Sequence, residues 1–448
     1  MAGSQGHDQA KQKQEEDAME AKERELVNAI APSVFLSVIS GAMLLSARQA
    51  VLMKHFATAA DTSIYLGKLA SIGAFFEFLI NPIFGKLADA YGRRPIMPIG
   101  NAAVAVTRVF VLLLPEMKFP HFVDSAITIP LVTSFFTTYR AMLADHLEGS
   151  AFARANAKIS MGAGAAIVLG PLITKAVMNR RDPKFCFLLS VCFASVSVLN
   201  IFFNVKESLP EEKRMPLVLK DMQPFGFLQL LKSNVLNRLM LTTGMQTFTE
   251  GRNVQDIYVS YLMNDLKWSW SQINTFISAF GSSLIVSGLT VKSLLKTFGL
   301  INFTTFSNMC NILFYLFFIR FPPLNFFPVT LSAYLGVLFA APGGRKRDAA
   351  ESLIMRIGNQ EGFGNGFISG CMNNYRALIN VIGPVMFGSL YAWGSKRKLS
   401  GLPFLVGILT ILASEASLRS LSKDELGLDE NGQVKDTASS TTKSSQVK

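Results

Sequence analysis

The chain has 448 residues, of which half are hydrophobic and only 17% are charged. A soluble protein of this composition would expose large apolar patches, whereas apolar blocks of about 20 residues suit a bilayer core of roughly 30 Å. The net charge of +12 is dispersed without a basic stripe, so the composition excludes a soluble globular protein and gives no reason to expect nucleic acid as a partner.

The chain begins with a polar tail, residues 1–26, which lacks the basic, apolar and small-residue parts of a cleavable signal peptide. We expect this tail to be helical near Glu15–Leu26. Twelve apolar segments follow, at approximately 27–48, 64–85, 96–115, 123–143, 159–179, 185–204, 236–263, 270–291, 298–319, 324–342, 364–393 and 400–418. The four cysteines fall within these segments at spacings that suit neither zinc nor a disulfide framework, so we expect packed thiols and no metal site.

Two polar stretches complete the predicted organisation. Residues 205–235 link the sixth and seventh segments, and residues 419–448 form a tail rich in Ser, Thr and Lys that we expect to be disordered. The sequence thus predicts an all-α integral membrane protein whose twelve helices form two pseudo-symmetric six-helix bundles, residues 27–204 and 236–418.

An internal repeat favours this division. Val168-Leu169-Gly170-Pro171 in the fifth segment is echoed by Val381-Ile382-Gly383-Pro384 in the eleventh, and the two starts, 168 and 381, lie about half a chain apart. A fainter echo sets Gly92 against Gly299. Because glycine and proline loosen a helix, Gly170, Pro171, Gly383 and Pro384 are candidate positions for helix bends.

Between the second and third segments the chain reads Gly85-Lys86-Leu87-Ala88-Asp89-Ala90-Tyr91-Gly92-Arg93-Arg94-Pro95. This short basic loop resembles the signature loop of the major facilitator superfamily, whose pattern is roughly G-x-L-x-D-x-x-G-R-R/K. The chain matches it at Gly85, Leu87, Asp89, Gly92, Arg93 and Arg94. The polar link contains Glu207-Ser208-Leu209-Pro210, which is similar to the link after helix 6 in the drug-antiporter-like, tetracycline-resistance-like members of the superfamily.

The resemblance implies a transporter that works by alternating access between two six-helix halves. Gly85 and Gly92 would permit tight turns and close helix approach. Asp89 would face the N-terminal end of helix 11, and Arg93 would pair with Asp145 at the end of helix 4. By this resemblance, such an Asp89–Arg93–Asp145 cluster would hold the two halves together in the outward-open state. The alternative is that these charges merely mark a cytosolic loop.

Charged side chains inside the segments need a reason, because each costs about 2.5–3.5 kcal/mol at the bilayer centre on insertion scales. They are Glu77, Arg108, Arg140, Glu250, Arg252, Asp256 and Arg376. The four arginines outnumber the three acids, and arginine binds carboxylate or phosphate groups in bidentate fashion. The balance favours an anionic or zwitterionic substrate.

The seventh segment is the richest in polar residues. Gln246 and Glu250 share one helix face, and the helix can bend at Gly251. The superfamily resemblance places helix 7 along the central cavity, so this stripe is a candidate substrate or proton site. Arg252 and Asp256 are spaced to form an i, i+4 pair. The alternative is an ion pair that holds helices together without a role in transport.

Two other segments carry polar residues on one face. The eleventh presents Asn373, Arg376 and Asn380, and the fourth presents Arg140 with two threonines. Both stripes should face protein or water rather than lipid. Arg140 lies near the cytosolic end of its segment, from which it can snorkel to the interface.

The chain departs from the drug-antiporter pattern in helix 4. The proton-coupling arginine expected early in that helix is missing, because the region reads Asp124-Ser125-Ala126-Ile127. The acids that tetracycline antiporters carry inside helices 1, 3 and 9 are also missing from those segments. These departures disfavour proton antiport of cationic drugs, and they leave Glu77 and Glu250 as candidate proton carriers.

The leading interpretation is a secondary active transporter for a small organic solute, with protons as candidate coupling ions, no cofactor, and membrane lipids around a monomer. The alternative is a transporter-like protein that no longer transports and serves as a sensor or a structural membrane subunit. An enzyme is disfavoured, because the histidines are scattered and the sequence has neither a nucleophile elbow nor a phosphate-binding glycine loop.

The loop charges predict that both termini are cytosolic. The links on the side of the signature loop carry more Lys and Arg than the links on the other side, as the positive-inside rule requires. Two outer loops, around Arg180-Arg181 and Lys396-Arg397-Lys398, are basic and depart from the rule.

Overall fold

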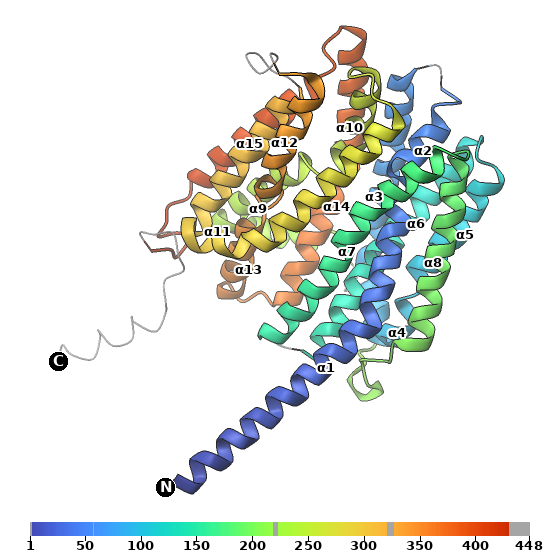
Figure 1. The fold of residues 1–448 in the computed structure, drawn as a ribbon. Helices are drawn as coiled ribbons and strands as arrows, with labels where there is room; N and C mark the ends of the chain where they lie inside the picture. The colour runs from blue at the N-terminus through green and yellow to red at the C-terminus, as the bar shows by residue number, and fades with distance from the viewer. Residues whose placement is uncertain (1, 57, 148, 218–222, 320–326, 430–448) are drawn as a thin grey trace. The chain divides into compact units, whose positions relative to one another are not determined.

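Helices dominate the computed structural model, which describes residues 2–429 apart from 57, 148, 218–222 and 320–326 (Figure 1). The helices before the polar link are α1 (Ala2–Ala42), α2 (Leu44–Leu52), α3 (Ala59–Tyr91), α4 (Arg93–Ile96), α5 (Ile99–Leu113), α6 (Lys118–Ala144), α7 (Gly149–Met178) and α8 (Lys184–Asn204). Those after it are α9 (Asn234–Phe248), α10 (Arg252–Asn264), α11 (Trp270–Phe318), α12 (Val329–Gly343), α13 (Asp348–Gln360), α14 (Asn365–Lys396) and α15 (Leu402–Arg419). The polar link contains the 3-10 helices η1 (Glu211–Lys213) and η3 (Gly226–Lys232).

The described helices form the twelve expected segments once their breaks are taken into account. α1 and α2 are separated only by Met43, and α4 continues into α5 after two residues. α11 joins the predicted eighth and ninth segments through Gly299, whose φ of 72° is not helical. Wider breaks separate α9 from α10 and α12 from α13. Of the helices that the structure describes, eight are long and apolar enough to cross a membrane.

The structure corrects the sequence prediction after the tenth segment. The stretch between the tenth and eleventh predicted segments contains α13, which hydropathy did not indicate because charged residues interrupt its apolar ones. Its apolar side chains recur at helical spacing, and Ala349, Ala350, Leu353 and Ile354 are buried. A short apolar stripe on a charged helix is visible from periodicity, but not from a window that averages hydropathy.

Both polar tails contain more structure than expected. α1 runs from Ala2 to Ala42, so the N-terminal tail and the first segment form one helix. After α15, Leu421, Leu426 and Leu428 are buried, and the carbonyl groups of Leu426 and Gly427 accept hydrogen bonds from Arg356. These leucines give the start of the C-terminal tail an apolar anchor. Residues 430–448 of the predicted tail lie outside the described residues.

Contacts divide the chain into two compact units. The first comprises Met1–Pro224, Arg252–Ile285 and Asn380–Ser400, and the second comprises Phe225–Gly251, Val286–Ile379 and Gly401–Lys448. The predicted bundles, residues 27–204 and 236–418, follow the order of the chain and stay a prediction. α7 and α14 continue as helices through their Gly-Pro pairs, and the proposed bends there also stay a prediction.

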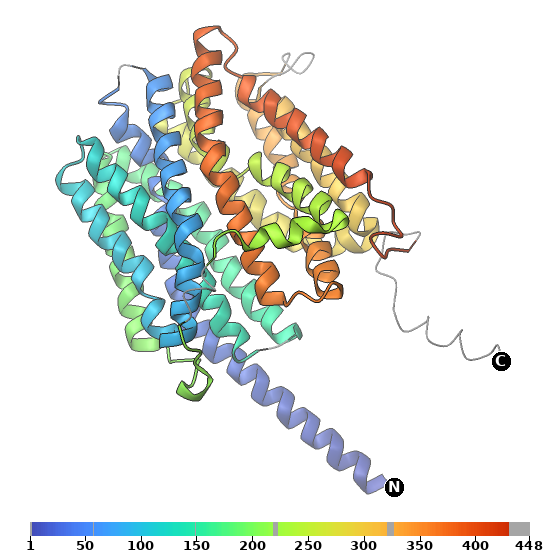
Figure 2. The same cartoon turned by 180° about the vertical axis from the view of Figure 1, so that it is seen from behind.

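In the first unit α1 packs along α7 and α8, and α6 packs against both α3 and α5 (Figures 1 and 2). Ile30 and Val34 of α1 share one core with Phe135 and Tyr139 of α6 and with Ile159 of α7. Inside a bilayer such contacts stabilise helix pairs by close van der Waals packing rather than by release of water. This packing holds α6 beside α5, which brings polar residues of the two helices together.

In the second unit α9 packs against α13, α15 and η3. Gly343 ends α12 beside α11, where an added Cβ would lie 2.9 Å from the backbone nitrogen of Asn311. Only a residue without a side chain permits this approach. The break between α12 and α13 therefore lies directly against α11.

Candidate functional site

The predicted signature loop is a tight turn between two helices. α3 ends at Tyr91, Gly92 has a φ of 100°, and α4 begins at Arg93. A residue with a side chain rarely adopts this φ, and an added Cβ would lie 2.5 Å from Oε2 of Glu207. At Gly85 no atom of the described residues in the same unit lies within 4 Å of an added Cβ, and its role in a close helix approach stays a prediction.

Arg93 lies between the two carboxylates that the resemblance assigned to it. Its Nη1 donates to Oδ1 of Asp89 at 2.5 Å, and its Nε lies 3.4 Å from Oδ2 of Asp145. Asp89 is one turn earlier in the chain, and Asp145 directly follows α6. The cluster therefore ties together the ends of α3, α4 and α6, while its role in gating stays a prediction.

The polar link completes this cluster in a way that the sequence did not indicate. Glu207 accepts hydrogen bonds from the backbone N–H groups of Arg93 at 2.9 Å and Arg94 at 3.1 Å. These donors begin α4 and have no partner within the helix. Ser208 donates its hydroxyl hydrogen to Oδ2 of Asp145 at 2.6 Å. The Glu-Ser-Leu-Pro sequence, noticed only as a family likeness, therefore binds the signature loop directly.

Backbone hydrogen bonds favour the ionised form of Glu207. Burial raises the pKa of its carboxyl, but the N–H groups of Leu209, Arg93, Arg94 and Ser208 together lower it by more, so the pKa lies below the ordinary value of 4.5. A carboxylate with a lowered pKa stabilises the fold above its ordinary pKa, and the stabilisation is lost as the pH falls through the lowered value.

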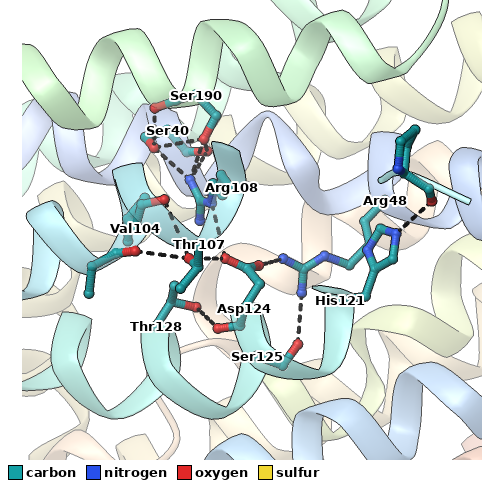
Figure 3. A network of polar contacts seen from close by, with 12 residues as sticks. Ser40, Arg48, Val104, Thr107, Arg108, His121, Asp124, Ser125, Thr128 and Ser190 are labelled. Carbon is teal, nitrogen blue, oxygen red and sulfur yellow. Dashed lines mark hydrogen bonds and ion pairs between the residues drawn. The ribbon is translucent and has the colours of Figure 1, made fainter. Parts of the chain in front are cut away.

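A buried carboxylate on α6 holds two arginines from other helices (Figure 3). The Asp124 side chain has no exposed surface, and its Oδ2 accepts a hydrogen bond from Nη2 of Arg48 on α2. Its Oδ1 accepts the hydroxyl hydrogen of Thr107 at 2.7 Å and lies 3.8 Å from Nε of Arg108 on α5. One carboxylate therefore serves two cations, which leaves this group of three with a net charge of +1.

The guanidinium group of Arg108 donates hydrogen bonds to oxygen atoms of α1 and α8. Its Nη1 donates to the carbonyl of Ser40 at 2.9 Å, to the hydroxyl of Ser40 at 2.6 Å, and to the hydroxyl of Ser190 on α8 (Figure 3). The sequence singled out Arg108 but missed Arg48 and Asp124. Those two lie at the ends of predicted segments, where a charge needs no special explanation.

Arg252 has a different partner from the one its spacing suggests. Its Nη1 lies 2.6 Å from Oε2 of Glu77 on α3, and Thr133 on α6 donates to the other oxygen of Glu77 at 3.0 Å. The predicted pair with Asp256 is not formed among the described residues. The reason is that Glu77 supplies a carboxylate from a neighbouring helix. Two residues predicted separately thus form one interhelical pair.

The second unit contains a charged cluster at the two wide helix breaks. Glu250 lies between α9 and α10, and Lys346 and Arg347 lie between α12 and α13. Oε2 of Glu250 is 2.7 Å from Nζ of Lys346, and Oε1 is 2.5 Å from Nε of Arg347. We call Glu250, Lys346, Arg347, Glu351 and Arg376 the break cluster.

Glu351 extends the break cluster to α14. Its Oε1 lies 2.9 Å from Nη2 of Arg376 and 3.8 Å from Nη1 of Arg347. Glu250 and Arg376 were predicted from the sequence, but Lys346, Arg347 and Glu351 were not, because they fall outside the predicted segments. The run Gly343-Gly344-Arg345-Lys346-Arg347 is the signal that could have found them, since two successive glycines favour an interruption of a helix.

The remaining candidates lie outside these clusters. Gln246 donates to the side chain of Asn308 at 3.1 Å, and Asn308 donates to Glu415 at 2.8 Å, which forms a buried chain of hydrogen bonds. Arg140 is exposed and lies over the ring of Tyr139. Asn373 and Asn380 are partly buried, and neither side chain makes a hydrogen bond within the described ranges. Of the predicted stripe on α14, only Arg376 enters a cluster.

Comparison with known proteins agrees with this fold. A sequence model of the Major Facilitator Superfamily matches residues 30–384, most of the chain. The chain belongs to the Major Facilitator Superfamily. It is therefore an integral, multi-pass membrane protein of a transporter family rather than an enzyme.

Individual relatives are distant. The chain is 21% identical over 365 residues to the human Hippocampus abundant transcript 1 protein, covering 80% of this chain and 71% of that one. It is 20% identical over 356 residues to the class C tetracycline resistance protein of Escherichia coli, covering 79% and 87%. The crystal structure of the human organic anion transporter MFSD10 (TETRAN) is similar at a TM-score of 0.60 and 16% identity, covering 88% and 99%. Other similar structures include nucleoside, D-xylose and peptide transporters, so the shared fold does not set the substrate.

Replacing Asp124 with asparagine should strongly destabilise the protein, because the buried Arg108 and the partly buried Arg48 would lose their carboxylate. Breaking a buried pair in this way costs about 3–5 kcal/mol. The change should appear as a large drop in the apparent melting temperature of detergent-purified protein. The matched control is Asp182→Asn, which removes an exposed ion pair with Lys54 at 2.9 Å that is worth less than about 1 kcal/mol. Equal losses in the two variants would contradict the assigned role of Asp124.

Replacing Glu207 with glutamine should lower the melting temperature at pH 7, because a neutral amide is a weaker acceptor for the N–H groups at the start of α4. The difference from wild type should shrink as the pH falls from 4.5, where the carboxyl of the unfolded chain becomes protonated, through the lower pKa of the native carboxyl. Glu211→Gln, at an exposed neighbour, serves as the control and should have little effect at any pH. A Glu207→Gln difference that stays constant with pH would show that the charge of Glu207 does not matter.

Proposed function

We propose that the protein is a secondary active transporter that moves a small organic solute across a membrane by alternating access. The observation that carries this proposal is the Arg93 cluster, in which Asp89, Asp145 and the polar link meet at the ends of three helices. Its carboxylates are partly exposed, so its ion pairs can break and form again at small free-energy cost. A contact of this kind suits a protein that alternates between two conformations.

The charges at membrane depth support an anionic or zwitterionic substrate. Arg48 and Arg108 share a single carboxylate, and the break cluster contains three cations and two carboxylates. An excess of cations is costly in an apolar environment unless an anion joins it. The similarity to a structure described as an organic anion transporter agrees with this assignment. We propose further that the protein acts as a monomer and that protons are its coupling ion.

Uptake into proteoliposomes tests the transport function directly. Purified protein should show saturable uptake of at least one solute from a panel of organic anions, amino acids, sugars and cationic drugs, with and without a pH gradient. Asp89→Asn should lower the uptake rate up to about fivefold, because it removes an ion pair worth roughly 1 kcal/mol in one conformation. Asp61→Asn, near the opposite end of α3, should not. No uptake of any solute by protein that melts cooperatively would favour the non-transporting alternative.

We also propose that the polar link and both termini face the cytosol. Glu211 in the link and Met117 between α5 and α6 are exposed positions on opposite sides of this arrangement. Single cysteines at these two positions should react with a membrane-impermeant maleimide from opposite faces of a sealed vesicle. Labelling of both from the same face would overturn the topology.

A further inference from the structure

A buried cation in one of the two wide helix breaks is neutralised by a carboxylate in the other. Lys346 lies in the break between α12 and α13, and its side chain is only 1% exposed. Its ammonium group donates to Oε2 of Glu250 at 2.7 Å and to Oδ1 of Asn311 at 3.1 Å. A buried ammonium group needs a negative partner. Glu250 is the carboxylate that supplies it in this structure.

Glu250 also binds the neighbouring cation. Its Oε1 lies 2.5 Å from Nε of Arg347, so each carboxylate oxygen pairs with a different base. The side chains of Glu250 and Arg347 are 21% and 27% exposed, so solvent reaches both of them, whereas Lys346 is buried. The carboxylate therefore lies between a buried cation and one that water can reach.

The other charged groups around Glu250 do not balance its two cations. Arg376 on α14 adds a third positive charge, and Glu351 on α13 pairs with it. Arg345 and Asp348 pair with each other at 3.5 Å and cancel. The break cluster as a whole keeps a net charge of +1. The cations also donate hydrogen bonds to Asn311 and Thr247, which are uncharged and leave this net charge unchanged.

We infer that the break cluster is a binding site for an organic monoanion, in which the substrate replaces the carboxylate of Glu250 on Lys346 and Arg347 as Glu250 takes up one proton. This inference rests on the proposed transport function and names its substrate class. Two carboxylates cannot share these cations without repulsion, so an incoming anion favours the neutral form of Glu250. Conversely, a proton on Glu250 frees both cations for the anion.

The charge balance of this exchange is simple. Before binding, Lys346 and Arg347 contribute two positive charges and Glu250 one negative charge. After binding, the substrate supplies the negative charge, and the carboxyl of Glu250 is neutral because the proton has formed an O–H bond there. The net charge of the site is the same in both states. One anion thus travels with one proton, and the carried charge is zero.

Calorimetry on the purified full-length protein tests the linkage with benzenesulfonate as the probe, because this anion does not titrate between pH 5.5 and 7.5. Wild-type protein should bind it more tightly at pH 5.5, with an affinity that changes by up to about tenfold per pH unit for one linked proton. Titrations in two buffers of different ionisation enthalpy should show uptake of up to one proton per anion. Benzamide is the neutral control probe, and any binding of it should occur without proton uptake.

Glu250→Gln is the decisive variant, since glutamine resembles the protonated carboxyl. It should bind benzenesulfonate at pH 7.5 about as tightly as wild type does at pH 5.5, with no proton uptake. Glu415→Gln is the matched control, because Glu415 is a buried carboxylate of the same unit outside the break cluster, and it should keep the pH dependence. Proton uptake that survives in Glu250→Gln, or binding without proton uptake in wild type, would overturn the inference.

Variants of Lys346 separate binding from folding. Lys346→Met should abolish benzenesulfonate binding in protein that still melts cooperatively, and Lys346→Arg should restore it in part. Unchanged affinity in Lys346→Met would overturn the site. Failure of wild type to bind benzenesulfonate would also overturn it. The transport function is judged separately, because uptake of any solute of the panel into proteoliposomes would support it whether or not the break cluster binds an anion.

Discussion

The structure depends on one constraint, which is that a charge held away from water must meet an opposite charge from another part of the chain. Hydrophobic burial cannot order helices within lipid, because the lipid is as apolar as the side chains. Ion pairs between helices therefore specify which helices are neighbours. Pairs of this kind join α2, α5 and α6 through Asp124, α3 and α10 through Glu77, and α13 and α14 through Glu351.

The same constraint explains how a stable charge network can serve a function. In both units a single carboxylate is shared by two bases, Asp124 in the first and Glu250 in the second. Asp124 is buried and accepts an additional hydrogen bond from the hydroxyl of Thr107, which suits a carboxylate that keeps the same partners. Glu250 is partly exposed and lies where two helices are interrupted, which suits a group that changes partners. Burial thus distinguishes two arrangements that are alike in chemistry.

The twelve segments could be predicted from the sequence because apolar length predicts a membrane helix. The Arg93 cluster could be predicted only from the resemblance of the loop to the superfamily signature, since Asp145 lies 52 residues from Arg93. The partners of Arg252 and Glu250 were out of reach, because an ion pair between helices depends on how the helices rotate and pack. α13 was missed for a different reason, since its charged residues interrupt its apolar ones and lower the hydropathy average, although Glu351 forms ion pairs with Arg347 and Arg376.

The binding of Glu207 to the start of α4 has a consequence for the order in which the chain folds. The group that caps Arg93 and Arg94 lies more than a hundred residues later in the sequence, after α8. During synthesis the turn between α3 and α4 leaves the ribosome long before its capping carboxylate exists. The turn between α3 and α4 therefore remains uncapped during early synthesis. Glu207 can cap it only after the first six segments have been made.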